Sequence, residues 1–200
     1  MPSKVSIIIP TIRRLRGMRA AEAALKHRGD NEVEILQEFD TARVGAPKMV
    51  KRLVEQAKHD LIMFLGDDTV PQKGYMDEAL SAMKTLPDGW GLVGMNDQFN
   101  DGNHLATHWL ADRRLLPLLD GEFFHTGYWH CFCDRELTMR TKEMGRYVYA
   151  KNAIVRHDHP MKTGHPLTGD YGRVYSKKWF EHDKQLLDDR TEGGWTEKAC

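Results

Sequence analysis

Short apolar runs alternate with helix-forming stretches through the first half of the chain, and this alternation restricts the possible folds more than any other feature. The runs are rich in aliphatic residues, which is typical of buried strands. The stretches between them carry apolar residues at helical spacing. Such an alternation predicts an α/β fold, a parallel sheet covered by helices on both faces. The predicted strands are residues 5–9, 33–39, 61–65 and 91–95, and the predicted helices are residues 14–28, 47–58 and a third that begins at Pro71.

The same spacing predicts which face of each helix packs on the sheet. Residues three or four positions apart lie on one side of a helix, so an apolar set at that spacing is expected to face inward. The predicted inward faces are Leu15, Met18, Ala21 and Leu25 in the first helix, Met49, Val50, Leu53, Val54 and Ala57 in the second, and Met76, Ala79, Leu80 and Met83 in the third.

The second half of the sequence is less regular. Residues 96–108 are polar and predict a loop. Residues 157–172 contain histidine, proline and glycine and predict an irregular segment. The expected regular elements are a helix over residues 134–144 that Gly145 ends, a strand within 147–155 and a helix over 176–189, followed by a frayed tail from residue 191.

Composition excludes several classes of protein. The 200 residues suit a single domain, and 29 basic against 29 acidic residues exclude a strongly basic, histone-like nucleic-acid binder. Apolar runs of five or six residues are too short to span a membrane, and early charges argue against a signal peptide. We therefore expect no stable membrane insertion. The three cysteines include one C-x-C pair, Cys131 and Cys133, without a second pair, which predicts reduced thiols in the cytoplasm and no zinc site.

Acidic side chains follow three of the four predicted strands. Ligands of parallel α/β sheets bind beyond the carboxyl ends of the strands, and here these ends lead into Asp40, the pair Asp67 and Asp68, and Asp97. Two adjacent carboxylates after the most apolar strand suit a hard divalent cation such as Mg²⁺ or Mn²⁺, which prefers oxygen ligands. The alternative is a turn in which Asp68 or Thr69 caps the next helix. The acids at the neighbouring strand ends favour a site.

Four stretches, in this order, carry a resemblance to a known family. Residues 5–11 (VSIIIPT) match an opening strand, and residues 61–68 (LIMFLGDD) match a strand followed by a DXD-type motif. Residues 134–145 and 147–157 match a helix that begins at an acid and the strand after it, which ends in histidine. Each motif is weak alone, but the ordered set, over roughly residues 4–159, is specific. It resembles the nucleotide-sugar-dependent glycosyltransferases of GT-A fold, especially family 2.

The resemblance implies an α/β, GT-A, Rossmann-like mixed sheet with helices on both faces. Residues 1–200 would be a single glycosyltransferase domain. Within it, residues 1–100 would bind the nucleotide sugar, residues 101–190 would bind the acceptor and carry the catalytic group, and residues 191–200 would be a tail.

The sequence departs from the family pattern at three places. Gly66 stands where the motif usually has its first acid, and Cys133 replaces the acid before Asp134. The acidic and serine-containing turn after the second strand is reduced to residues 38–41. These departures affect the assignment of the substrate more than that of the fold.

The resemblance also implies roles for the strand-end residues. Asp68 would ligate the Mn²⁺ or Mg²⁺ ion that bridges two donor phosphates and neutralises the charge on the leaving nucleoside diphosphate. Asp67 would meet the ribose or a metal-bound water, and Asp40 would accept a hydrogen bond from the base. A plain turn role for Asp40 and a surface role for Arg13 are the alternatives. The expected donor-binding residues are Pro10, Thr11, Arg13, Asp40 and Asp67.

Asp134 is the expected catalytic base. An inverting transfer needs a carboxylate that takes the proton of the acceptor hydroxyl as its oxygen attacks the anomeric carbon. The alternative is that Asp134 caps its helix, while Glu136 and Arg140 pair at the i, i+4 spacing.

His157 is the second expected metal ligand, since the resemblance places a histidine there that some family members use on the metal. His159 is two residues away in an extended segment and could share its face. We expect a structural role for His159.

Three aromatic residues are candidates for acceptor binding, because aromatic rings stack on sugar or base faces. They are Trp109, Tyr128 and Trp129. We expect two of the three to be core residues instead.

Residues 135–179 carry ten basic and four acidic side chains, a net charge of +6, which could steer a phosphate-bearing donor or a polyanionic acceptor. A solvated face balanced by the acidic tail is the alternative.

Taken together, these features predict a metal-dependent glycosyltransferase. It would use a UDP-linked sugar as donor and a hydroxyl group as acceptor, and the transfer would invert the anomeric carbon. The acceptor could be a glycan, a small molecule or a modified nucleic acid. One alternative is a nucleotidyltransferase, but residues 10–13 lack the glycine-rich loop that such enzymes place after the first strand. Another is an inactive module that binds sugar or nucleic acid, which the missing acids at Gly66 and Cys133 would fit.

Overall fold

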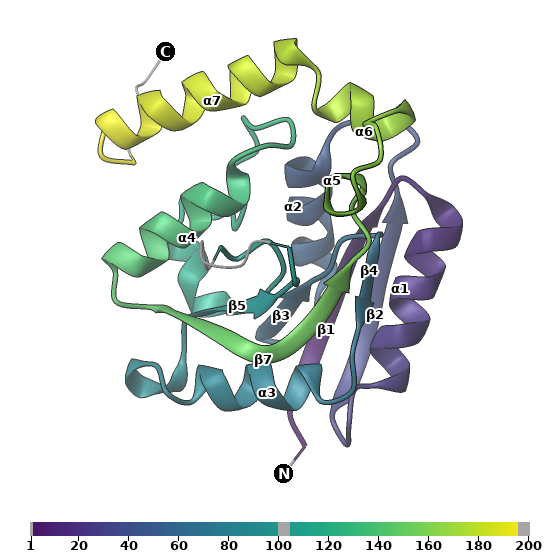
Figure 1. Cartoon of the computed structure of the whole chain (residues 1–200). Coiled ribbons are helices and arrows are strands. Elements are labelled where there is room, and N and C mark those ends of the chain that lie inside the picture. The colour runs from purple at the N-terminus through teal and green to yellow at the C-terminus, as the bar shows by residue number, and fades with distance from the viewer. Residues whose placement is uncertain (1, 100–104, 196–200) are drawn as a thin grey trace.

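One mixed sheet of seven strands forms the centre of the computed structural model, which describes residues 2–99 and 105–195 (Figure 1). The strand order is β2-β1-β3-β6-β5-β7-β4. The strands β1, β2 and β3 run parallel, as do β5 and β7. The strands are β1 (Lys4–Thr11), β2 (Glu32–Phe39), β3 (Leu61–Phe64), β4 (Thr69–Pro71), β5 (Leu92–Asn96), β6 (Trp109–Asp112) and β7 (Tyr147–His157).

Two antiparallel strands make the sheet mixed instead of purely parallel. The strand β6 pairs antiparallel with both β3 and β5, and β4 pairs antiparallel with β7. The purely parallel sheet predicted by the alternation alone is therefore wrong, and the mixed GT-A-like sheet is confirmed. Sequence reasoning missed both strands because each is only three or four residues long and, unlike the equally short β3, neither is an unbroken run of aliphatic and aromatic residues. A run that short shows no clear period, and Pro71 ends β4 instead of opening a helix.

Helices cover both faces of this sheet (Figure 1). One core cluster joins α1 and α3 to the sheet, and the other joins α2, α4 and α7 to its opposite face. In β1 the side chains of Ile7 and Ile9 enter the first cluster and Ile8 enters the second, as the alternation of a strand requires. The α-helices are α1 (Arg14–Lys26), α2 (Ala46–Gln56), α3 (Tyr75–Met83), α4 (Cys133–Glu143), α5 (Pro160–Thr163), α6 (Gly169–Val174) and α7 (Lys177–Glu192), and two 3₁₀ turns are η1 (Pro87–Gly89) and η2 (Arg113–Leu118).

The face that helix α1 packs on the sheet differs from the predicted one, and of the predicted residues only Ala21 packs against the core cluster. Leu15 and Met18 are 74% and 55% exposed, whereas Gly17, Ala20 and Ala24 are buried. A Cβ atom at Gly17 would lie only 2.4 Å from Nε2 of Gln37, so this helix approaches the sheet too closely for larger residues. The inward faces predicted for α2 and α3 are confirmed.

A buried ionic cluster holds α7 against α4. Glu136 accepts hydrogen bonds at 2.8 Å from Nε and from Nη2 of Arg190, and one at 2.7 Å from the hydroxyl of Tyr128. Arg140 lies 3.4 Å from Glu136 and 2.9 Å from Asp120. The predicted Glu136–Arg140 pair therefore exists, but it is buried, so part of the positive charge of residues 135–179 does not face solvent.

No helix in the described ranges is both long and apolar enough to span a bilayer.

Candidate functional site

A cavity of about 350 Å³ lies beyond the carboxyl ends of β1, β2 and β3. These strands are parallel and adjacent, so their ends meet at one edge of the sheet. Residues of α4, of α6 and of the segment after β7 close the cavity from the other side. Nine of the residues predicted from the sequence line it, namely Pro10, Thr11, Arg13, Asp40, Asp67, Asp68, Trp129, Asp134 and His157.

Asp67 ties the segment after β1 to the end of β3. Its Oδ2 accepts hydrogen bonds from the backbone N–H groups of Ile12 (2.9 Å) and Arg13 (2.8 Å). Its Oδ1 accepts from the guanidinium of Arg13. This buried carboxylate therefore shapes the loop at one wall of the cavity, and Arg13 is a site residue with its charge directed inward.

Asp68 lies among three partners. Its Oδ2 accepts from Arg13 at 3.1 Å and from the hydroxyl of Tyr171, and its Oδ1 lies 3.3 Å from Nε2 of His157. Burial alone would raise the pKa of Asp68, but the hydrogen bond and charge of His157, with the charge of Arg13, hold that pKa well below its usual range. Tyr171 lies in α6, and sequence reasoning missed it. The segment 157–172 was predicted to be irregular, which is wrong for residues 160–163 and 169–172, because they lie in the short helices α5 and α6.

His157, the last residue of β7, lies between two carboxylates. The pairing of β4 with β7 sets it opposite Thr69, which brings it beside Asp68. Its Nδ1 lies 3.5 Å from Oδ2 of Asp97. Burial lowers the pKa of this imidazole, but the hydrogen bonds and charges of Asp68 and Asp97 outweigh it and raise the pKa to about 9.

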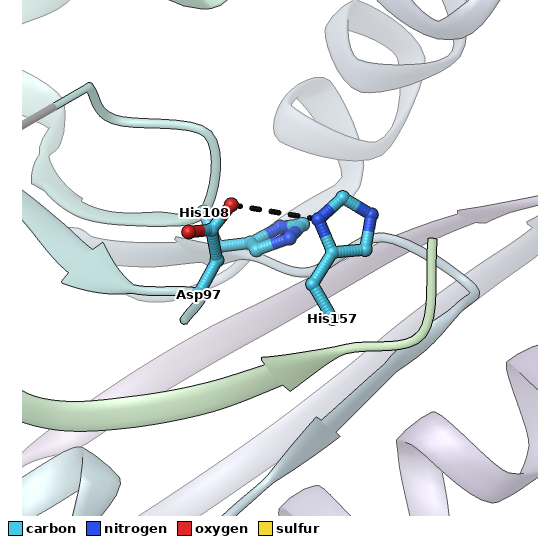
Figure 2. Close-up of side chains that lie close together, drawn as sticks. All are labelled: Asp97, His108 and His157. Carbon is cyan, nitrogen blue, oxygen red and sulfur yellow. Dashed lines mark hydrogen bonds and ion pairs between the residues drawn. The ribbon is translucent and has the colours of Figure 1, made fainter. Parts of the chain in front are cut away.

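A second histidine, His108, joins this group. Asp97, His108 and His157 each offer one ligand atom, and these atoms all lie within 4.8 Å of one another (Figure 2). All three residues are buried, and burial lowers the pKa of His108 to about 3, so its ring is neutral. Asp97 was expected only as a strand-end acid. His108 was not expected at the site, because the strand β6, which begins directly after it, was not predicted.

Asp134 lies in the first turn of α4 and lines the cavity. Its Oδ1 accepts from the N–H of Arg135 at 2.9 Å, and its Oδ2 accepts from the hydroxyl of Thr107 at 3.3 Å. The N-cap position belongs to Phe132, so Asp134 is not the capping residue. Burial is the main cause that raises the pKa of Asp134 above its usual range. A raised pKa makes the carboxylate a better proton acceptor.

Asp40 both forms a turn and faces the cavity. Its carboxylate accepts from the N–H groups of Val44 (2.8 Å) and Gly45 (3.1 Å), which shapes the loop before α2. Thr11 also lines the cavity, with its hydroxyl bonded to the carbonyl of Ile9 and to Gln37. The turn role proposed as an alternative for Asp40 is therefore present, alongside a position in the cavity wall.

The structure brings only one of the three candidate aromatic residues to the cavity. Trp109 is fully buried and stacks on Phe64, and Tyr128 is buried with its hydroxyl donating to Glu136. Neither lines the cavity, because the strand register of β6 and the ionic cluster below α7 turn both side chains into the core. Trp129 lines the cavity and stacks on Trp179 with ring centroids 4.2 Å apart.

The segment that carries Trp129 is held by a carboxylate that sequence reasoning missed. Asp183 of α7 has no exposed surface and accepts hydrogen bonds at 2.8 Å from the N–H groups of Trp129, His130 and Cys131. Its signal in the sequence is weak, since an acid on an amphipathic helix usually faces solvent.

No protein-family model matches this sequence, and no curated protein matches it either. Solved structures do match. A mannosyltransferase from Pyrobaculum calidifontis, in complex with GDP-Man and Mn²⁺, superposes with a TM-score of 0.66 at 14% identity, over 100% of this chain and 66% of that one. The chain thus spans slightly less than two thirds of that protein.

Two further solved structures agree with this match. Glucosyl-3-phosphoglycerate synthase from Mycobacterium tuberculosis, with Mn²⁺, UDP-glucose and phosphoglyceric acid, has a TM-score of 0.61 at 13% identity, over 98% of this chain and 82% of that chain. TarS from S. aureus has a TM-score of 0.56 at 12% identity, over 98% and 75% respectively. At these identities the likeness shows the fold, so the chain has the GT-A fold.

Proposed function

We propose that this GT-A-fold protein is a metal-dependent glycosyltransferase. It would transfer a sugar from a nucleoside-diphosphate sugar, namely a UDP-sugar, to a hydroxyl group of the acceptor. The anomeric carbon would be inverted. One observation carries the proposal: the carboxylates Asp67, Asp68 and Asp134 line a single cavity at the carboxyl ends of the parallel strands. Structural neighbours of the same fold were solved with nucleotide sugars and Mn²⁺.

The donor would lie along the segments that follow β1, β2 and β3. Arg13 directs a positive charge into the cavity, where it can contact a phosphate. Each carboxylate oxygen of Asp40 accepts one backbone hydrogen bond and can accept another, so Asp40 could also accept a hydrogen bond from an N–H group of the base. Pro10 and Thr11 form the adjoining wall, and Asp67 holds the loop in place.

The donor set fits a divalent cation. Asp68 and His157 approach within 3.3 Å and would hold Mn²⁺ or Mg²⁺. When bound, the ion would neutralise the charge that grows on the leaving diphosphate. Arg13 and Tyr171 donate to Oδ2 of Asp68, so the ion would bind through Oδ1, the oxygen that lies nearest His157.

Asp134 would act as the base. Its pKa is raised by burial, and the hydroxyl of Thr107 and the N–H of Arg135 orient the carboxylate. As the acceptor oxygen attacks the anomeric carbon, Asp134 takes the hydroxyl proton while the diphosphate departs. Trp129, which lines the same cavity, would offer a ring face to the acceptor, whether a glycan, a small molecule or a modified nucleic acid.

One observation favours a second function, a binding module without catalysis. In this structure the guanidinium of Arg13 supplies a positive charge to Asp67 and Asp68, as a metal ion would. A module of this kind would bind a nucleotide sugar with no need for a metal and would not turn it over.

Incubation with a panel of nucleotide sugars distinguishes these functions. We expect release of nucleoside diphosphate that depends on Mn²⁺ or Mg²⁺ and disappears in excess chelator. His27→Gln, at a partly exposed histidine that directly follows α1 and lies outside the cavity, is the matched control and should turn over normally. Binding that persists in chelator, with no hydrolysis of any donor, would favour the binding module and contradict the enzyme.

A further inference from the structure

Three buried side chains from three strand ends meet at one edge of the cavity. Asp97 directly follows β5, His108 directly precedes β6, and His157 ends β7 (Figure 2). The backbone N–H of Met95 donates to the carbonyl of His108 at 2.9 Å, so β5 and β6 hold Asp97 and His108 on one rigid frame. His108 and His157 line the cavity, whereas Asp97 lies behind them.

The distances within this cluster suit one metal ion. The three ligand atoms lie within 4.8 Å of one another. Ligands at ~2.1 Å around a tetrahedral ion lie ~3.4 Å from one another, so side-chain rotations that shorten the separations by at most ~1.4 Å would close the cluster around one ion. Two imidazoles and one carboxylate form a donor set that prefers first-row transition metals to Mg²⁺.

An unpartnered buried atom points to the same conclusion. His108 is 2% exposed, and its Nε2 has no hydrogen-bond partner within residues 2–99 and 105–195. Its Nδ1 accepts from the N–H of Gly66 at 3.4 Å, a long hydrogen bond that is weakly held. Burial of a polar atom without a partner is costly, and a metal ion would supply the missing partner once the ring proton moves to Nδ1 and the Gly66 contact is released.

We propose that Asp97, His108 and His157 form a binding site for a first-row transition-metal ion such as Zn²⁺ or Co²⁺, here named the inner site. His157 would ligate through Nδ1, the nitrogen nearest Asp97, and donate its Nε2–H to Asp68. A carboxylate that accepts from the second nitrogen of a ligating histidine fixes the orientation of its ring. Asp68 is then an orienting residue of the inner site and not one of its ligands.

The inner site goes beyond the proposed function. A neutral imidazole has one free lone pair, so His157 can ligate one ion at a time. With the inner site filled, Asp68 would hold the ion of the donor together with phosphate oxygens, an arrangement that Mg²⁺ commonly adopts. The inner site binds its ion without any nucleotide sugar, so its test is independent of glycosyl transfer.

The experiment measures metal binding on the full chain after chelator dialysis. Zn²⁺ or Co²⁺ is added, unbound ion is removed by gel filtration, and the bound metal is counted by elemental analysis and by the visible spectrum of Co²⁺. We expect one ion per chain. Asp97→Asn and His108→Gln should each weaken binding by at least tenfold, because even residues that only orient a ligand contribute 10–100-fold.

Two matched variants locate the ion. His159→Gln removes a buried histidine whose ring centroid lies 5.3 Å from that of His157 but which is not part of the cluster. We expect it to bind the ion as the parent chain does, and Asp68→Asn to lose less affinity than His108→Gln. Circular dichroism of each metal-free variant checks folding, and His108→Asn serves as a second variant if Asp97→Asn does not fold.

Three results would overturn the inner site. One is a parent chain that retains no Zn²⁺ or Co²⁺. Another is wild-type binding by folded His108→Gln and Asp97→Asn. The third is a loss of binding in Asp68→Asn that exceeds the loss in His108→Gln, which would place the ion at Asp68. None of these results bears on donor turnover, which is measured separately with nucleotide sugars.

Discussion

The two walls of the cavity are built in different ways. The wall formed by the ends of β1, β2 and β3 is positioned by backbone pairing, because parallel strands in register bring their carboxyl ends to one edge. The opposite wall, from α4, α6 and the segment around Trp129, is held by buried side chains such as Glu136 and Asp183. A wall made from strand register can be anticipated from short sequence windows. A wall held by side chains from distant segments cannot.

The strongest test of the strand-built wall is Asp68→Ala. We expect this change to abolish metal-dependent transfer and to weaken nucleoside-diphosphate binding in Mn²⁺, because the ion loses its carboxylate ligand. Transfer assays and equilibrium binding on the same preparation check both effects. Full activity of the variant, or activity that excess chelator leaves unchanged, would remove the metal from this wall.

Asp134→Asn tests the side-chain-held wall without changing its shape. Asparagine keeps the size and the hydrogen-bonding capacity of aspartate but cannot take the acceptor proton. Turnover should fall by ~10²–10⁴-fold, the usual contribution of a positioned general base. Donor and metal affinity should stay near the wild-type values.

Two measurements decide this prediction, the donor dissociation constant and the transfer rate. Asp134→Glu is a useful companion, because it keeps the base and shifts it by one methylene. If Asp134→Asn transfers at the normal rate, the base lies elsewhere.

Arg190→Met tests how the second wall is held. The change leaves Glu136 buried without its closest cation, and loss of one partner of a buried ion pair costs about 3–5 kcal/mol. We expect the free energy of unfolding to fall by that amount in denaturant titrations. Lys184→Met, at an exposed pair on the same helix, should change it by less than about 1 kcal/mol. Equal effects of the two changes would contradict a wall held by the buried cluster.

The pH dependence of the free energy of unfolding, measured on the metal-free protein, tests the contacts of His157, which lies where the two walls meet. The folded state raises the pKa of His157 from 6.5 to about 9, through Asp68 and Asp97 and against burial. Its charge therefore stabilises the fold fully below pH 6.5, and this stabilisation is lost as the pH rises to about 9. The free energy of unfolding should fall over that range by up to about 1.4 kcal/mol per pH unit.

The control for this pH prediction is His157→Gln, which removes the titrating group. Denaturant titrations at several pH values, in chelator, compare the two proteins. Burial is the main cause that lowers the pKa values of the flanking His108 and His159 to about 3 and about 4, so both are neutral in the folded state and take up protons only on unfolding near or below pH 6.5. The comparison is therefore made above about pH 7.5, where neither residue contributes to the slope. A slope that survives in His157→Gln would assign the effect to another group.

The smallest effects should come from the exposed side of α1. Met18→Gln and Leu15→Gln should alter the free energy of unfolding by no more than about 0.5 kcal/mol, because both side chains face solvent. Ala20→Leu, on the side that packs closely on the sheet, should cost about 1–3 kcal/mol by overpacking. Thermal melts of the three variants compare the two faces. A larger loss from Met18→Gln than from Ala20→Leu would reverse the assignment.

Apart from β4, the sequence by itself determined the strands and helices of the first half and the acids at their ends. Periodicity and composition act over windows of five to fifteen residues, so β1, β2, β3 and the packed faces of α2 and α3 could be predicted from them. The rule for parallel strand ends then placed Asp40, Asp67 and Asp68 at one edge. The order of the motifs added Asp134 and His157 to the same expected site.

The tertiary structure alone decided the rest. The close approach of α1 at Gly17 selected its small face, and the two short antiparallel strands brought His108 to Asp97 and His157 to Asp68. The same packing turned Trp109 and Tyr128 into the core. These outcomes depend on contacts between residues far apart in the chain, and such contacts are set by which surfaces fit together, a property that no local pattern of residues records.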